Sequence, residues 1–335
     1  MEKKKIWGFI LGMALFGTAP LFPQDLADLQ RAAGEFSGAL AKSLPFNSAL
    51  GLNWADAYVG MFLPGIPPHF GAGIALGYTT MDLEVFDGLL RQFDLSVPGG
   101  FNLGRMVFPG YVAEARIGGF ILPFDAGLKF GVFENLGNSS GAMDYFLGGG
   151  EFRYALIDGK KNLLLPNLSL GVGLNYLSGS FTGSKSSLVI SVPPGATVSG
   201  GDTLALSNVE AGLRWETMTL DFKAQVSKSF LIITPYAGLG TSHAWSNAGY
   251  SVEADIPALS DADRSSINAA LENAGLEGVD FSGRGFSTTL KETGWSFRVF
   301  GGVSVNLALF RLDLTGLYNF SDGNYGVTLG GRFQI

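Results

Sequence analysis

Charged residues in this chain recur at a spacing of two, each followed or preceded by an apolar neighbour. Opposite charges stand two positions apart in Glu114/Arg116 and Arg311/Asp313. A spacing of two places both side chains on the same face of a β-strand. Opposite charges on one face either pair and neutralise each other or line a path that selects ions by charge.

The same face collects nearly every charge that falls inside an expected strand. An isolated charge that faces lipid costs about 2–4 kcal/mol at the bilayer midplane, so in a membrane these side chains must point into a lumen. In a narrow lumen they would pair and seal it, whereas in a wide one their slight positive excess would favour anions. The lumen-lining candidates are Glu114, Arg116, Lys129, Glu151, Arg153, Glu210, Arg214, Asp221, Lys223, Arg298, Arg311, Asp313 and Arg332.

The two histidines, His69 and His243, are the remaining candidates for chemistry. His69 follows two prolines and is expected in a turn at the barrel rim. His243 stands near Ser242 and Ser246, a combination that a surface hydrolase could use. No carboxylate is spaced to orient this imidazole, and no second His or Cys supports a metal site. We therefore expect no catalytic residues, no metal and no cofactor, and an enzyme is the least favoured function.

The elements that position these residues are strands of period two. The last eleven residues alternate apolar Tyr325, Val327, Leu329, Phe333 and Ile335 with Gly, Thr, Arg and Gln. The chain is 47% apolar and only 15% charged, and it contains 49 glycines, against about 25% charged residues in soluble proteins. This pattern predicts an all-β fold, an antiparallel transmembrane β-barrel. A soluble β-sandwich with an apolar core is the alternative.

About eleven strands can be recognised, the region 46–62 being the weakest, and the even number of bacterial barrels leads us to expect about twelve (range 10–14). Residues 46–335 form the expected barrel. Short links alternate with long connections near 81–109, 136–143, 183–206 and 247–289, the expected extracellular loops. Between 209–215 and 218–226 the apolar face changes phase near Glu216, which predicts either a β-bulge or a tight turn. Residues 81–93 and 260–276 carry helical patterns within two of these loops.

The first 24 residues read as a signal peptide, because a basic start precedes an apolar run of about a dozen residues, too short to span a bilayer. Residues 25–45 show helical spacing and predict a short amphipathic helix, either a plug in the barrel or a periplasmic segment. The chain contains no Cys and carries a net charge of −7. The acidic balance argues against nucleic acid as a partner. We expect export to a bacterial outer membrane, with its lipid as the surrounding partner.

The C-terminal TLGGRFQI resembles the assembly signal of bacterial and organellar outer-membrane barrels, with Thr328, Gly330, Phe333 and Ile335 at its defining positions. The resemblance implies recognition by the outer-membrane barrel assembly machinery. The segment SKSFLIITPYAGLG resembles uncharacterised barrel proteins of spirochaetes, which bring no assigned activity. The N-terminal lumen segment is similar, by distant analogy, to that of long-chain fatty-acid transporters, although no signature residues of that family are found.

Three functions follow in order of preference. The first is a porin-like passive channel or transporter for small solutes or apolar molecules, because the lumen-facing charges suit an aqueous path. The second is a non-conducting surface barrel with a structural or adhesive role. The third is an outer-membrane hydrolase built on His243.

Overall fold

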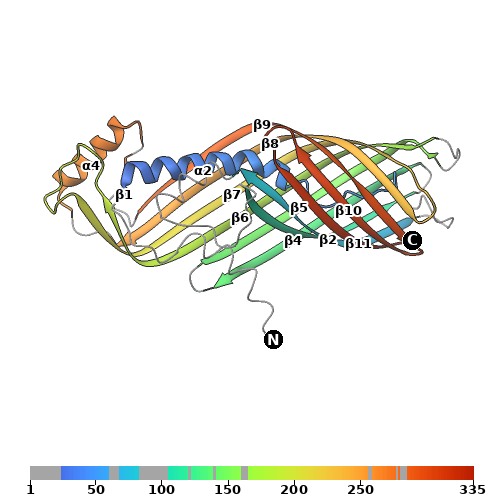
Figure 1. Ribbon diagram of the computed structural model, residues 1–335, viewed down its shortest axis with the longest axis horizontal. Helices are drawn as coiled ribbons and strands as arrows, with labels where there is room; N and C mark the ends of the chain where they lie inside the picture. The colour runs from blue at the N-terminus through green and yellow to red at the C-terminus, as the bar shows by residue number, and fades with distance from the viewer. Residues whose placement is uncertain are drawn as a thin grey trace.

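The protein is a closed β-barrel with a helix and an irregular segment inside it (Figure 1). The computed structural model describes residues 24–59, 68–82, 105–119, 122–138, 141–159, 165–255, 259–276, 278–279 and 285–335. Ten strands, each antiparallel to its neighbours, form the ring, which closes where the last strand pairs with the first barrel strand. The strands are β2 (His69–Asp82), β3 (Arg105–Gly118), β4 (Phe124–Asn138), β5 (Gly141–Ile157), β6 (Asn167–Ser191), β7 (Thr203–Ser227), β8 (Ile233–Asp255), β9 (Gly285–Leu307), β10 (Phe310–Asn319) and β11 (Tyr325–Gln334).

The chain's last residue takes part in this closure. Phe70 and Ile335 exchange both backbone hydrogen bonds, at 2.8 and 3.0 Å. Within the expected assembly signal, Thr328 and Gly330 face the interior, whereas Ile335 is 47% exposed on the outer face. Because an unpaired strand edge in hydrocarbon costs several kcal/mol per group, a strand that extends to the terminus is what closure requires.

The ring has ten strands, within the expected range but fewer than the twelve favoured by the sequence. The weakest expected strand, near 46–62, is not a barrel strand. Its residues 48–59 form no β-pairing and are enclosed by the barrel. An irregular segment that is buried on all sides carries no period by which it could be separated from a strand.

A band of exposed apolar side chains surrounds the part of the barrel nearer the short turns. It includes Leu76, Leu128, Leu239 and Leu314, all at least half exposed. Aromatic residues border this band on both sides. Toward the short turns these are Phe70, Phe124, Phe152, Phe310 and Phe333, and toward the long loops Tyr78, Tyr176, Trp245, Trp295 and Tyr318. An apolar band between two aromatic girdles is the lipid-facing surface of a transmembrane barrel.

The strands on one side of the ring continue well beyond this band. β6 and β7 contain 25 residues each, whereas crossing a bilayer takes about 9–11. Beyond the band, on the long-loop side, the apolar residues of β7 change from the outer face to the inner face. Phe222 and Val226 point outward to lipid, whereas Trp215 and Val209 point inward and are buried. Outside the membrane water covers the outer face, so the apolar residues turn to the interior.

This exchange explains the phase change near Glu216, where neither a bulge nor a turn exists. The pairing of β6 with β7 runs through this point without a register shift. The irregularity lies instead between Ser207 and Glu210 in the pairing with β8, where Asn208 has φ 49°. The expectation that Glu210 and Arg214 line the lumen is wrong, because both are exposed on the outer face above the membrane band.

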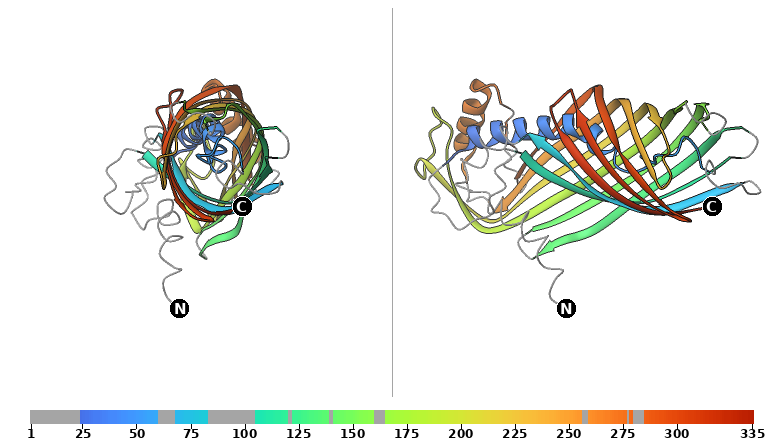
Figure 2. Two further views of the ribbon diagram at one scale, coloured as in Figure 1. Left: turned by 90° about the vertical axis from the view of Figure 1, so that its right-hand side faces the viewer. Right: turned by 45° about the vertical axis from the view of Figure 1, so that its right-hand side comes forward.

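The helix α2 (Leu26–Asn47) lies inside the ring, as the end-on view shows (Figure 2). Of the two positions left open for the N-terminal helix, the structure has the one within the barrel. Leu40, Ala41 and Leu44 pack in an apolar cluster with the inward side chains of the wall, among them Leu147 and Leu177. Neither α2 nor the second helix, α4 (Asp261–Asn273), is long and apolar enough to cross a membrane.

The chain enters α2 from a two-residue strand, β1 (Gln24–Asp25), which pairs in parallel with the tip of β6. Apart from Gln24, the expected signal peptide 1–24 lies outside the described residues. The helical pattern expected at 81–93 also lies outside them, except for its first two residues, which end β2.

The extended strands leave shorter loops than the sequence suggested. The connection expected at 183–206 is only 192–202, and the one expected at 136–143 is reduced to 139–140. The connection at 247–289 loses its ends to β8 and β9 and contains α4. The error has a physical cause, because polar outward residues above the membrane resemble loop composition while the strands continue.

Helix α4 lies within the helical pattern expected at 260–276 and begins with a capping box. Ser260 accepts a hydrogen bond from the Asp263 N–H, and the Asp263 side chain accepts one from the Ser260 N–H, while Gly275 at φ 75° ends the helix. Ile267 and Leu271 are fully buried against Leu26 and the tips of β6 and β7. These residues form a small apolar core, here called the cap, at the end of the barrel that carries the long loops (Figure 1).

The lipid-facing band gives a first prediction. Leu314→Arg places a charge in the middle of the band and should lower the free energy of unfolding in lipid vesicles by about 2–4 kcal/mol. Phe320→Arg, at the girdle, is the control and should cost at most about 1 kcal/mol. Equal effects of the two changes in urea titrations would contradict the assignment of this surface to lipid.

The cap gives a second prediction. Hydrogen bonds from the Ser199 N–H and the Ser260 hydroxyl lower the pKa of Asp263 from 3.8 to about 2. A carboxylate with a lowered pKa stabilises the fold above its unfolded pKa, and this contribution disappears as the pH falls through the folded value. The protection factors of the α4 amides, which compare the measured exchange rates with those of an unfolded chain at the same pH, should therefore fall between about pH 4 and pH 2, and Asp263→Asn should remove this dependence. Unchanged pH dependence in the variant would contradict it.

Candidate functional site: a polar plug inside the barrel

The interior of the barrel at membrane depth is filled by residues 48–59, here called the plug. The plug continues α2 toward the short-turn end, and all its residues are buried except Tyr58, which is half-buried. Gly51 and Leu52 adopt positive φ angles of 80° and 57°, so the chain turns sharply at the point of entry. Such backbone has no regular hydrogen-bond ladder of its own, and its polar groups need other partners.

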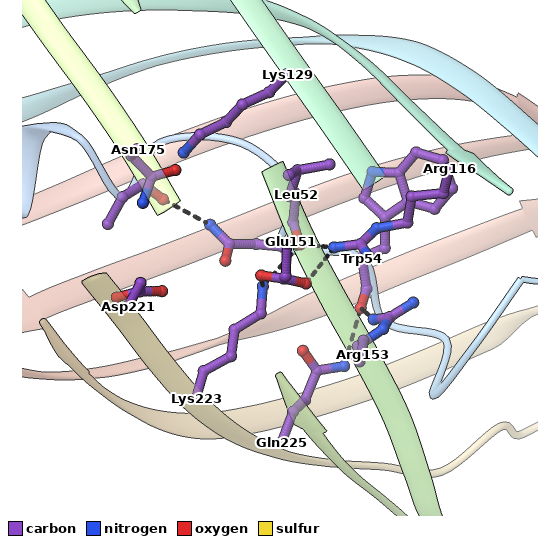
Figure 3. Close-up of polar contacts among 12 residues, drawn as sticks. Leu52, Trp54, Arg116, Lys129, Glu151, Arg153, Asn175, Asp221, Lys223 and Gln225 are labelled. Carbon is purple, nitrogen blue, oxygen red and sulfur yellow. Dashed lines mark hydrogen bonds and ion pairs between the residues drawn. The ribbon is translucent and has the colours of Figure 1, made fainter. Parts of the chain in front are cut away.

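Cationic and amide side chains of the wall supply those partners to the plug carbonyls (Figure 3). Lys129 Nζ donates to the carbonyl oxygens of Ser48 at 2.7 Å and Leu50 at 2.6 Å. Arg116 and Lys223 both donate to the Leu52 carbonyl, each at 2.9 Å. The carbonyl of Trp54 accepts from Arg153 at 3.1 Å and from Gln225 at 2.9 Å, and Gln225 also reaches Ala55.

Carboxylates hold the N–H groups of the same segment. Glu114 accepts from the Leu52 N–H at 2.5 Å and from the indole N–H of Trp54 at 2.7 Å. Asp125 accepts from the Val59 N–H at 2.9 Å. The plug is thus fixed at both ends and in the middle by charges of both signs.

The indole of Trp54 lies between two guanidinium groups. The Arg332 carbon Cζ is 4.5 Å from the ring centroid, and the Arg116 Cζ is 5.5 Å away. A cation over an aromatic face gains about 2 kcal/mol when both groups are desolvated. Gly71 makes room for the ring, because a Cβ there would lie 2.7 Å from it.

The wall cations are in turn neutralised by buried carboxylates. Asp125 bridges Arg116 and Arg153, at 2.7 Å in each case, and none of these three side chains is more than 1% exposed. Glu151 pairs with Arg116 and, at 2.5 Å, with Lys223. A buried charge left without a partner is costly, so these residues depend on one another.

A second group of charges surrounds Asp56 on the other side of the plug. Asp56 pairs with Arg332 at 3.2 Å and with Arg311 at 3.7 Å, and Arg332 also pairs with Asp313. Elsewhere on the wall, Asp221 pairs with Arg298 at 2.7 Å and accepts from Ser242 at 2.6 Å, and both charged residues line a small cavity with Lys129 and Lys223. Asp56 is the one plug residue that brings a charge of its own.

Of the thirteen expected lumen residues, Glu210 and Arg214 lie outside the barrel. The other eleven lie inside it and belong to this network. The closest ion pairs of these cations run between strands or to the plug. Arg116 contacts Asp125 and Glu151, and Arg311 contacts Asp56, while Glu114 accepts from the plug. The twist and tilt of the strands bring residues of neighbouring strands and of the plug closer than same-strand neighbours.

Three residues of the network were missed by the sequence reading. Asp125 is separated from Lys129 by an even number of positions, so it lies on the same face of its strand and its inward direction could have been recognised. Gln225 lies on the same face of β7 as Asp221 and Lys223. Asp56 carried no such signal, because the plug has no strand period.

The structure separates the residues considered for a hydrolase. His243 faces outward and packs against Trp245 and Trp295, with ring centroids 4.6 and 4.9 Å apart. Ser242 and Ser246 are buried on the opposite face. His69 begins β2 at the short-turn rim. Within the ranges that the structure describes, no group of three or more His, Cys, Asp or Glu is arranged to hold a metal ion.

Small polar cavities flank the plug on two sides. Each has a volume of about 10 Å³, room for roughly one water molecule. One is lined by Lys129, Asn175, Asp221 and Lys223, the other by Glu114, Asp313 and Thr315. Neither of these two cavities is large enough to form a path past the plug.

Comparisons with known proteins agree on the fold. No protein-family model matches the chain, and a search of curated proteins finds no match. Among solved structures, the chain is similar to the outer membrane protease OmpT from Escherichia coli, with 11% identity, a TM-score of 0.43, and coverage of 82% of this chain and 100% of that one. The translocator domain of the autotransporter NalP from Neisseria meningitidis gives 13% identity, a TM-score of 0.35, and coverage of 92% and 98%.

The Ralstonia pickettii toluene transporter TbuX gives 11% identity, a TM-score of 0.26, and coverage of 81% and 90%. By their names these three proteins are a protease, a translocator domain and a transporter. The activity of this chain must therefore be inferred from its own interior.

The mutual dependence of the buried charges gives a third prediction. Asp125→Asn leaves Arg116 and Arg153 without their shared carboxylate and should lower the free energy of unfolding by about 3–5 kcal/mol. The control is Glu210→Gln on the outer surface, which should change stability by less than about 0.5 kcal/mol. A neutral Asp125→Asn in urea unfolding would show that the charge network is not a source of stability.

Proposed function

We propose that this protein is an outer-membrane channel for small anionic solutes, closed by the plug in the state described. The observation that carries the proposal is the way the plug is held. It forms no β-pairing with the wall, and its carbonyls are bound by side chains that also have partners of their own. Those side chains can exchange the plug for water or for a solute without breaking the barrel.

Charge balance supports an anionic solute. Seven buried wall cations (Arg116, Lys129, Arg153, Lys223, Arg298, Arg311, Arg332) face five wall carboxylates (Glu114, Asp125, Glu151, Asp221, Asp313). Without the plug and its Asp56, the described wall keeps two positive charges more than negative ones. Rings of Arg and Lys select anions in aqueous pores.

The polar character of the interior also supports a channel over a permanently filled barrel. Replacing a buried ion pair by apolar residues of similar volume is often neutral or stabilising. Around α2 the same barrel is filled by apolar side chains. The charged wall that serves the backbone of the plug would also suit water in this part of the lumen once the plug is displaced, which an apolar wall would not.

A non-conducting surface barrel is the second candidate, and the filled lumen is the observation that favours it. In this case the cap would carry the structural or adhesive role, and the plug would seal the lumen permanently. Planar-bilayer recording separates the two candidates, because only a channel passes current when the plug is loosened.

The experiment that tests the channel loosens the plug in the full chain. Trp54→Ala removes the indole between Arg116 and Arg332 and its hydrogen bond to Glu114. We expect the wild type to be closed for most of the recording and the variant to show frequent opening steps. Reversal potentials in a salt gradient should indicate anion preference. A folded variant without openings would overturn the channel proposal in favour of the permanent seal.

A reversible lock completes the test. The chain has no Cys, and the hydroxyl oxygens of Ser48 and Thr219 are 3.2 Å apart, so Ser48→Cys with Thr219→Cys can join the plug to β7. In the Trp54→Ala background, oxidation should abolish the openings and reduction should restore them. The matched control is Thr217→Cys with Ser246→Cys, whose oxygens are 2.7 Å apart and join two wall strands. Oxidation of this control should leave the current unchanged.

A further inference from the structure

The path of the chain before β2 carries an inference that does not depend on conduction. β1 pairs in parallel with β6, Gln24 opposite Ile190 and Asp25 opposite Ser191. These β6 residues precede the connection 192–202, which lies at the end of the barrel that carries the long loops. In Figure 1, β1 and α4 lie together at one end and the C-terminus at the other.

The start of α2 is anchored at the same end. Leu26 and Ala27 are buried in the cap with Ile267 and Leu271, and the Tyr250 hydroxyl donates to the Gln30 carbonyl at 3.4 Å. An apolar cluster and a hydrogen bond thus hold the first turns of α2 against the cap and β8. The position of the start of α2 is therefore built into the fold.

From this anchor the chain runs through the lumen to the opposite end. Helix α2, with 22 residues, extends about 33 Å. The plug follows, and Val59 is bound by Asp125 next to the turn between β3 and β4. β2 then begins at His69, opposite Gly118 at the short-turn rim. The segment 24–59 thus crosses the membrane layer once more, inside the ring.

Outer-membrane barrels have short turns in the periplasm and longer loops outside the cell. We propose that the barrel holds the start of its N-terminal helix at the outer surface, where β1, the start of α2 and the cap form one folded surface unit. A segment inserted at the start of α2 would be carried to the cell surface, so the barrel has a display function in addition to any transport.

Epitope insertion in the full chain tests this placement on intact cells. The tag is inserted between Asp25 and Leu26, after the expected signal peptide and at the start of α2. The outer comparator carries the same tag after Asp322, in the turn between β10 and β11, and the periplasmic comparator carries it after Leu231, which is fully exposed between β7 and β8. With an antibody that cannot cross the outer membrane, we expect the tags at 25 and 322 to be stained and the tag at 231 to need permeabilisation.

Staining of the Asp25 tag only after permeabilisation, with the 322 tag stained on intact cells, would overturn the proposal. Because an insertion can prevent assembly, single cysteines at the same places (Asp25→Cys, Asp322→Cys, Leu231→Cys) provide a second measurement with a membrane-impermeant maleimide. The chain has no other Cys to react. Labelling at 25 that follows the 231 site instead of the 322 site would likewise overturn it. Neither readout requires an open pore, so a silent channel and a wrong placement give different results.

Discussion

The structure depends on one requirement: an irregular stretch of backbone at membrane depth must find a partner for each of its polar groups. The carbonyls of Ser48, Leu50, Leu52 and Trp54 receive hydrogen bonds from Lys, Arg and Gln side chains of the wall. Cations buried for this purpose need carboxylates nearby, which Asp125 and Glu151 supply. The charge pattern along the strands therefore follows from the plug, and neither could exist in this form without the other.

The two fillings of the barrel show the same rule from opposite sides. A helix satisfies its own backbone, so the wall around α2 needs to supply only apolar surface, such as Leu147, Leu177 and Tyr145. The plug satisfies little of its own backbone, so the wall around it is charged. The chemistry of the inner face changes along the axis at the point where the helix ends, near Asn47, whose side chain accepts from Thr79.

The barrel fold and most of the inward-facing charges could be predicted from the two-residue period of the strands. The wrong predictions share one cause. Alternation shows that a strand has two unlike faces but does not say which environment each face meets. Along β7, Phe222 faces lipid and Arg214 faces water, although both lie on the outer surface. The outward-facing residues therefore change from apolar to polar within one strand. The loops were overestimated for the same reason. The plug was read as a strand because burial on all sides removes the period, and the partners of Arg116 and Arg311 depend on strand tilt, which no single strand encodes.

The closed ring also constrains how the lumen can be filled. The plug contacts side chains from β3, β4, β5, β7, β10 and β11, so its partners are complete only when β11 has met β2. At the far end, the cap holds Leu26 beyond the membrane band with residues of α4 and the β6 tip. The closed ring and its filling therefore complete each other, because the pairing of Phe70 with Ile335 that seals the edge also encloses the charges that bind the plug.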